Sequence, residues 1–308
     1  MGSESDSQAT VQDRISALPD AVLYHILAFL ETKCTVRTSI LSKRWKNIWA
    51  YVPNLYLNDE DFSSFADFIV FVDRALLIRE SSAIQKFHLH CNMCHAEDFS
   101  RIDGWIRTAI RYNVVELDLC IDADTEEMFE LPKSLLTCKT LMVWKLWSTY
   151  TIKIPISGWY PNLKFLRVKF KYPSLFNPDN DSMDFSHFPV LEYLRIDGSL
   201  GFDAFNLNVC VPALKTLRIS LNHEYHQREA YNFLINAPKL EKLDVKEGYL
   251  SNYTFKNTKS LVEANIHVFS EEDDEQAASA TRATKFLSGI SGVKCLTISS
   301  PFSTVSIH

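Results

Sequence analysis

The sequence predicts an α/β chain in which a small helical module precedes a solenoid built on one parallel sheet. The pattern apolar-x-x-apolar-x-apolar occurs nine times between residues 84 and 298, and each copy is long enough for one short strand. Ahead of the first copy, residues 13–53 carry apolar side chains at helical rather than strand spacing. The length of 308 residues allows two domains, and an apolar content of 46% is sufficient for a sizeable core.

The repeated pattern starts anew at irregular steps of 21 to 32 residues. Such self-similarity is the signature of leucine-rich repeats, in which each unit gives one strand of a parallel sheet. One repeat buries about three apolar side chains, which stabilise it by less than the cost of ordering about 25 residues. The units must therefore fold as a stack. The nine copies begin at Ile84, Val114, Leu141, Leu163, Leu191, Leu214, Leu240, Leu261 and Val293.

We expect the stack to form a horseshoe with the parallel sheet on its concave face. Only Asn92 and Asn222 occupy the position where such repeats usually carry asparagine, so the convex side is expected to be irregular. After the helical module, the sequence predicts a strand over 55–57, a turn and helix cap over 58–61, and helices over 62–79 and 98–112.

Residues 13–53 predict three short helices. Pro19 suits the first turn of a helix, where its missing N–H is not needed. A second helix is expected from about residue 35 to 41. Ser42 is a candidate N-cap for a third helix, which Pro53 ends.

The module carries more apolar side chains than three short helices can bury. One interpretation is an ordinary helical subdomain with Trp45 and Trp49 in its core. The other is a module that leaves an apolar face for a partner protein. Three segments, in order, resemble the F-box of plant F-box/LRR proteins, including those with a further FBD region. They are Leu18-Pro19-Asp20, Ile26-Leu27 and Leu41-Ser42-Lys43-Arg44-Trp45, and Glu31 stands where that family often has proline.

This resemblance implies docking onto the Skp-family adaptor of a cullin–RING (SCF-type) ubiquitin ligase. It implies a non-catalytic subunit, with an F-box over 13–57 and a repeat domain over 58–308 that binds the substrate protein; the tail over 1–12 is expected to be disordered because it is polar. The alternatives are a repeat protein that binds a peptide or anion outside any ligase, and an enzyme. The residues expected to form the adaptor-binding surface are Leu18, Pro19, Asp20, Leu23, Ile26, Leu27, Leu41 and Trp45.

Strand alternation places the residue between the last two apolar positions of each copy on the concave surface, about 5 Å from its neighbours. These residues are His88, Asp118, Lys145, Arg167, Arg195, Arg218, Asp244, Asn265 and Thr297. Four consecutive ones are basic, with Trp147, Phe165, Lys169 and Tyr193 beside them. Unit charges at this spacing repel by about 0.8 kcal/mol per pair even in water.

The basic row has two interpretations. It is either a solvated polar face or a binding strip for an acidic, phosphorylated or otherwise anionic ligand. The residues that would form the strip are Lys145, Arg167, Lys169, Tyr193, Arg195 and Arg218.

The sequence predicts no cofactor, metal site or catalytic set. Cys91-Asn92-Met93-Cys94-His95 matches the C-x-x-C-H pattern of haem attachment, and the nearby His88 and His90 raise the possibility of zinc. We reject haem because the motif begins at the end of a repeat strand and no export signal precedes it. The two histidines alternate with apolar residues, as expected for an exposed strand face. No glycine-rich phosphate loop or local nucleophile signature is present.

Composition favours a protein of the cytoplasm or nucleus with no membrane or nucleic-acid partner. The start of the chain lacks the apolar core of a secretory signal, and no apolar run reaches membrane-spanning length. The seven cysteines are typical of reduced thiols. The net charge of −6 comes mostly from residues 271–275, a run expected to be a solvated loop or helix start. Because the family's FBD region follows the last repeats, we expect it to be missing or truncated in a chain that ends at His308.

Overall fold

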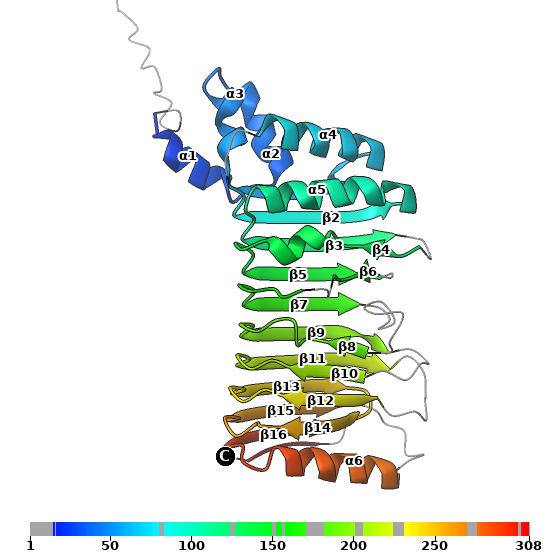
Figure 1. Cartoon of the computed structure of the whole chain (residues 1–308). Coiled ribbons are helices and arrows are strands. Elements are labelled where there is room, and N and C mark those ends of the chain that lie inside the picture. Colours follow the sequence, from blue (N-terminus) through cyan, green and yellow to red (C-terminus); the bar gives the residue numbers. More distant parts are fainter. Residues whose placement is uncertain are drawn as a thin grey trace, which may run out of the picture.

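The computed structural model describes residues 15, 17–79, 83–123, 127–149, 152–155, 158–170, 182–200, 206–223, 231–269, 276–300 and 303–307. A helical module stands at one end of a long stack of strands, and a single helix covers the other end (Figure 1). The tail over 1–12 and the acidic run 271–275 lie outside the described residues.

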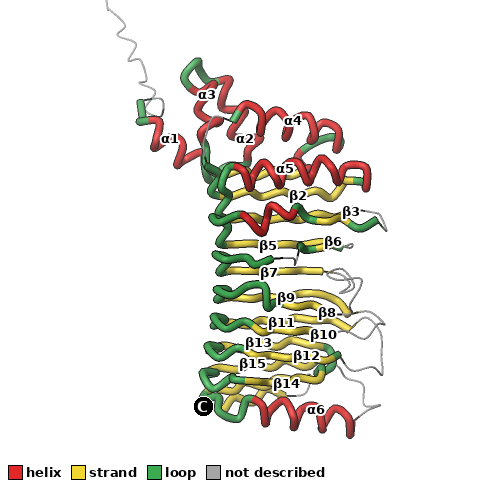
Figure 2. Tube along the Cα trace, viewed as in Figure 1, coloured by secondary structure: helices red, strands yellow, loops and turns green. Residues whose placement is uncertain are grey.

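An 11-stranded sheet runs through the whole stack, and every predicted repeat strand belongs to it (Figure 2). Neighbouring strands are parallel, except that the last two are antiparallel. The confirmed prediction is therefore a helical module followed by a repeat solenoid with a parallel sheet. In spatial order the strands are β1 (Asn54–Asn58), β2 (Lys86–Cys94), β3 (Glu116–Ala123), β5 (Val143–Ser148), β7 (Phe165–Phe170), β9 (Tyr193–Leu200), β11 (Thr216–His223), β13 (Lys242–Glu247), β15 (Glu263–Val268), β16 (Cys295–Ser300) and β17 (Ser303–Ile307).

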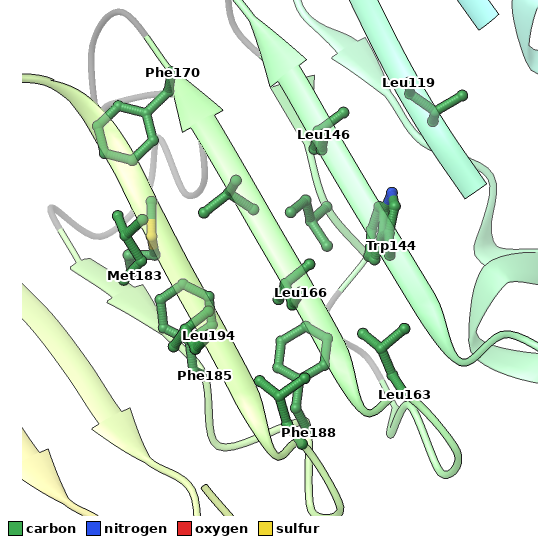
Figure 3. Close-up of a cluster of buried hydrophobic side chains, with 14 of the residues drawn as sticks. Leu119, Trp144, Leu146, Leu163, Leu166, Phe170, Met183, Phe185, Phe188 and Leu194 are labelled. Atoms are coloured by element: carbon green, nitrogen blue, oxygen red, sulfur yellow. The ribbon is translucent and has the colours of Figure 1, made fainter. Parts of the chain in front are cut away.

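The apolar positions of the repeat form the core on the inner face of this sheet. Trp144, Leu166 and Leu194 are paired across β5, β7 and β9, and none of them is exposed to solvent. Phe185 and Phe188, from the segment leading into β9, close the core on the side away from the sheet (Figure 3). Each repeat thus buries side chains against its two neighbours, as the stacking argument requires.

The expectation of an irregular convex side is wrong for the second half of the stack. A second parallel sheet forms there, because Phe233 and Tyr253 on neighbouring strands turn into the core. On its outer side, Asn232 Nδ2 donates to Asn206 Oδ1 (3.4 Å) and Asn252 Nδ2 donates to Asn232 Oδ1 (3.3 Å). The strands, in order, are β14 (Asn252–Lys256), β12 (Asn232–Asn236), β10 (Asn206–Cys210) and β8 (Ser182–Asp184); β4 (Phe129–Glu130) and β6 (Ile152–Lys153) pair separately.

The helices lie at the two ends of the stack. The N-terminal module (residues 15–53) contains α1 (Asp20–Leu27), α2 (Thr32–Arg37) and α3 (Trp45–Ile48), with 3-10 helices at Thr38–Ile40 and Trp49–Tyr51. The helices predicted over 62–79 and 98–112 are α4 (Phe65–Ile78) and α5 (Phe99–Arg111); α6 (Gln276–Gly289) was not predicted, and short 3-10 helices occur at Asp59–Asp61, Ala96–Asp98 and Lys133–Thr137.

Three helix starts differ from the sequence-based expectation. The second helix begins at Thr32, whose hydroxyl accepts a hydrogen bond from the Tyr56 amide in β1 (2.8 Å). Ser42 does not cap the third helix, which begins at Trp45. The cap of α4 is Ser64, whose hydroxyl accepts the Asp67 amide (3.2 Å). At Thr32 and Ser64 a side-chain contact, not the apolar periodicity, marks where the helix begins.

The N-terminal module is joined to the sheet by backbone-directed hydrogen bonds. Besides the Thr32–Tyr56 bond, Asn54 Nδ2 donates to the Ala28 carbonyl (3.0 Å). Arg79, at the end of α4, donates from Nη1 to the Val52 carbonyl (2.8 Å). Because β1 directly follows the module and pairs with β2, the module covers the first edge of the sheet and leaves no linker between the two.

One buried carboxyl lies inside the second half of the stack. Glu247, at the end of β13, is fully buried; its Oε1 accepts the Tyr253 hydroxyl (2.5 Å) and its Oε2 accepts the Ser251 amide (2.8 Å). Burial raises the pKa of Glu247 from 4.5 to about 7, because the charged form loses its hydration. The folded chain therefore holds this proton more tightly than the unfolded chain does.

We expect the free energy of unfolding to fall as pH rises through the pKa of Glu247. The stabilisation from its proton is fully present below about pH 4.5 and is lost as pH rises through about 7, a change of about 3 kcal/mol. Glu247→Gln removes this titration. Urea unfolding at pH 5 and pH 8 should show that the free energy of unfolding of the variant rises relative to the wild type by up to that amount at the higher pH. The exposed Glu97→Gln control should show no such change. A difference that is flat with pH would contradict the prediction.

Candidate functional site

The N-terminal module exposes an unusual number of apolar side chains. Of the nineteen large apolar residues that are exposed among the described residues, eight lie between residues 15 and 51. Ile40 is 85% exposed, Phe29 77% and Leu41 63%. We call these eight the exposed apolar set: Ile15, Val22, Ile26, Phe29, Leu30, Ile40, Leu41 and Tyr51.

The module nevertheless has a core of its own. Leu23, Leu27 and Trp45 are buried there, together with Ile48 and Val52. Leu23, Leu27 and Trp45 were among the predicted adaptor-binding residues. Because they are buried, they would support a docking surface from within rather than contact a partner. The predicted residues that the structure leaves at least partly accessible are Leu18, Pro19, Asp20, Ile26 and Leu41.

The structure brings together the two ends of the segment that carries the resemblance. Arg44 Nε donates to Asp20 Oδ1 (3.0 Å), and Arg44 Nη2 also donates to the Leu18 carbonyl. The Leu18–Asp20 turn is thereby held beside the segment that contains Leu41 and Trp45. The side chains predicted from separate motifs thus belong to one small unit.

Sequence reasoning missed most of the exposed apolar set, although a signal for part of it exists. Val22, Ile26 and Phe29 recur at steps of four and three, as on one helical stripe. A second stripe, with Leu23 and Leu27, is the buried one. A short helix that is apolar on two sides can bury only one of them in its own core, and the remaining apolar side is typical of a partner-binding helix.

The outer face of the 11-stranded sheet carries the predicted row of middle positions. Strand pairing aligns Lys145, Arg167, Arg195 and Arg218 as consecutive partners on β5, β7, β9 and β11. The remaining five predicted positions continue the same row on both sides: His88, Asp118, Asp244, Asn265 and Thr297.

Carboxylates balance the two ends of the basic row. Lys145 Nζ lies 2.6 Å from Glu116 Oε1 on β3, and Arg218 Nε lies 3.8 Å from Asp244 Oδ2 on β13. Partial burial acts to raise the pKa of Glu116, but the hydrogen bonds and charges of Lys145 and Lys86 lower it below its ordinary value. The repulsion between the basic residues is therefore smaller than their spacing alone implies, because acids lie beside both ends of the row.

Aromatic side chains flank the row on both sides. The rings of Phe165 and Tyr193 stack with centroids 4.5 Å apart and an interplanar angle of 4°. The Arg218 guanidinium lies over Tyr193, 5.9 Å from its ring centroid. On the other side of the row, Lys169 Nζ lies 5.3 Å from the Trp147 ring centroid. The predicted strip residues therefore share one continuous basic and aromatic surface.

The C-x-x-C-H segment serves the end of β2 and the turn after it. Cys91 and Cys94 are buried, and Cys94 Sγ donates to the Asp122 carbonyl (3.4 Å). Burial raises the pKa of Cys94 to about 12, which keeps it a thiol. The His95 amide donates to the Asp98 carboxylate (3.0 Å) in the turn before α5. Within the described part of the chain, no three metal-ligating side chains come together, and none of the seven cysteines forms a disulfide.

None of the helices in the described ranges has the length and hydropathy needed to cross a membrane.

Comparison with known proteins assigns the N-terminal module. The F-box domain family matches residues 15–57. Over 94% of its length the chain is 32% identical to the F-box/LRR-repeat protein At3g59200 of Arabidopsis thaliana, of which the alignment covers 59%. No solved structure matches the chain.

Two further Arabidopsis thaliana relatives extend this picture. The F-box/LRR-repeat protein At4g14103 is 34% identical over 83% of the chain and 67% of the relative. The F-box/FBD/LRR-repeat protein At5g56420 is 30% identical over 88% of the chain and 64% of the relative. The chain spans about 60% of the length of the curated relatives it matches. The F-box match, the repeat solenoid behind it and these relatives together show that the chain belongs to the plant F-box/LRR-repeat family.

Proposed function

We propose that this chain is the substrate-recognition subunit of an SCF-type (cullin–RING) ubiquitin ligase, acting in the cytoplasm or nucleus without catalysis of its own. The observation that carries the proposal is the exposed apolar set on a module that already has a complete core. Apolar side chains that a small core does not use are typical of a binding surface. Their partner would be the Skp-family adaptor, and through it the cullin.

The substrate protein would bind the outer face of the sheet. Lys145, Arg167, Lys169, Tyr193, Arg195 and Arg218 are the proposed contact residues. This face is broad, carries side chains from successive repeats, and lies on a different part of the chain from the exposed apolar set. Such separation allows one fixed partner and one variable partner to bind at the same time.

Co-expression with a plant Skp-family adaptor and a cullin tests the ligase assignment. We expect a stable ternary complex on gel filtration that forms without any substrate. Binding of anionic peptides by a chain that never associates with the adaptor would instead favour a repeat protein acting outside a ligase.

Charge reversal on the outer face should separate the two activities. Arg195→Glu with Arg218→Glu places two negative charges in the basic row, so capture of substrate by the complex should fall at least tenfold, and more at low salt than at high salt. Adaptor binding should stay unchanged, because both residues lie outside the N-terminal module. Substrate capture that survives this reversal at low ionic strength would make the row a solvated face only.

A further inference from the structure

Two arginines at the centre of the basic row converge on one carboxylate. Arg167 Nε lies 3.1 Å from Asp197 Oδ2, and Arg195 Nε lies 2.8 Å from the same oxygen. Asp197 is only 8% exposed, and it sits in the next outward row of β9. Each arginine donates to Asp197 through Nε, and the Arg195 side chain also hydrogen-bonds Tyr193. Because the bonds to Asp197 use Nε, each guanidinium keeps Nη donors that Asp197 does not engage.

Positive charge is in excess at this point of the sheet. Among the charged side chains of β5, β7, β9 and β11, Asp197 alone is acidic. At the two ends of the row, Lys145 and Arg218 have carboxylate partners on the flanking strands β3 and β13. The two central arginines share a single carboxylate, and Lys169 on the adjacent outward position has only an aromatic ring beside it among the described contacts. An anion at the centre would therefore neutralise the face.

The two guanidinium groups of Arg167 and Arg195 favour one kind of anion. One guanidinium fork matches one carboxylate, whereas two converging forks offer more donors than a single carboxylate can accept. A phosphate monoester carries three acceptor oxygens and close to two negative charges at neutral pH. The stacked Phe165 and Tyr193 lie one outward position away on the same two strands, and this aromatic pair suits an apolar neighbour of the charged group.

We propose that the outer face recognises a phosphorylated side chain in the substrate protein, held by the terminal nitrogens of Arg167 and Arg195, with an adjacent apolar residue on the Phe165–Tyr193 stack. This inference rests on the proposed substrate-recognition function and specifies its ligand. Asp197 acts as a positioning residue, because it draws the two guanidinium groups to one point without touching the phosphate.

Degenerate peptide libraries test this with the full chain bound to its adaptor. Fluorescein-labelled libraries would carry a fixed central phosphoserine, phosphothreonine or phosphotyrosine, and matched libraries would carry the unphosphorylated residue or glutamate. Fluorescence anisotropy should show at least one phosphorylated library binding about tenfold or more tightly than both matched forms.

Variants at the site separate a phosphate clamp from a general basic surface. Arg167→Ala and Arg195→Ala should each weaken phosphopeptide binding about tenfold, and Arg195→Lys should weaken it similarly, because lysine keeps the charge and loses the fork. Asp197→Asn adds a net positive charge, yet it should weaken binding several-fold because the arginines lose their anchor. Lys246→Ala removes one charge from the same face, on β13, and should change binding less than twofold; melting temperatures confirm that each variant is folded.

Three outcomes would overturn the inference. Equal binding of the glutamate libraries would show that the face recognises an acidic segment. Full binding by Arg195→Lys would show that charge alone is sufficient. Absence of binding by every library, while the adaptor complex remains intact, would refute phosphate recognition and leave the ligase assignment standing. Phosphopeptide binding by a chain that forms no adaptor complex would instead uphold the inference and refute the ligase assignment.

Discussion

Replacing Ile40 and Leu41 together by aspartate should abolish co-purification with the Skp-family adaptor and leave the rest of the chain folded. The two side chains are 85% and 63% exposed and contribute little to the module's own core. Burying two such side chains in an interface is worth about 3 kcal/mol or more, so their loss should weaken adaptor binding by at least about a hundredfold. Two buried carboxylates would weaken it further.

The chain offers a closely matched control. Leu77, on α4, is 83% exposed and lies outside the N-terminal module. Leu77→Asp should therefore leave adaptor binding unchanged. Leu18 is a less clean choice for the test, because it packs partly against the module core and its replacement would also affect folding. Adaptor pull-down combined with thermal unfolding separates the two effects. Retained binding by the folded double variant would exclude this face as the docking surface.

Leu194→Ala should cost about 2–5 kcal/mol of unfolding free energy, whereas Arg195→Ala should cost about 1 kcal/mol or less. Leu194 is fully buried and pairs with Leu166 and Leu217 on the neighbouring strands, so its loss leaves a cavity shared by three repeats. Arg195 faces outward; its replacement removes two hydrogen bonds to Asp197, which keeps its bond to Arg167.

Denaturant unfolding of the two variants checks this prediction at adjacent residues of one strand. Because side chains alternate between faces, an error of one residue in register would exchange the two results. A larger loss for Arg195→Ala than for Leu194→Ala would therefore contradict the placement of every side chain on β9.

The repeat strands could be predicted from the sequence because one pattern encodes both the strand and its inner face. Leu166 and Leu194 occupy equivalent positions of the same six-residue pattern, and each is buried for the same reason. The second sheet could not be predicted in this way. Its pairing of Asn206 with Asn232 depends on how far each repeat extends before turning, and the variable repeat lengths hide that distance.

The site was partly predictable, and its gaps have physical causes. The basic row follows from strand alternation, but Asp197 was overlooked because only basic and aromatic residues were considered at the outward positions beside the row. It stands two residues after Arg195, on the same face, and was therefore visible in the sequence. The exposed apolar set is different, because Ile40 and Ile48 look alike in sequence and only the packing of α1 against α3 decides that Ile48 is the buried one.

The junction between the N-terminal module and β1 has a consequence for how the proposed ligase would choose its target lysines. The hydrogen bonds at Thr32, Asn54 and Arg79 tie the N-terminal module directly to the sheet, with no linker in between. A substrate held at Arg167 and Arg195 would stand at a set distance and direction from the rest of the assembly. The distance from the bound site to the rest of the assembly would then be fixed. The lysines modified would be those that the substrate's own shape and flexibility bring within reach.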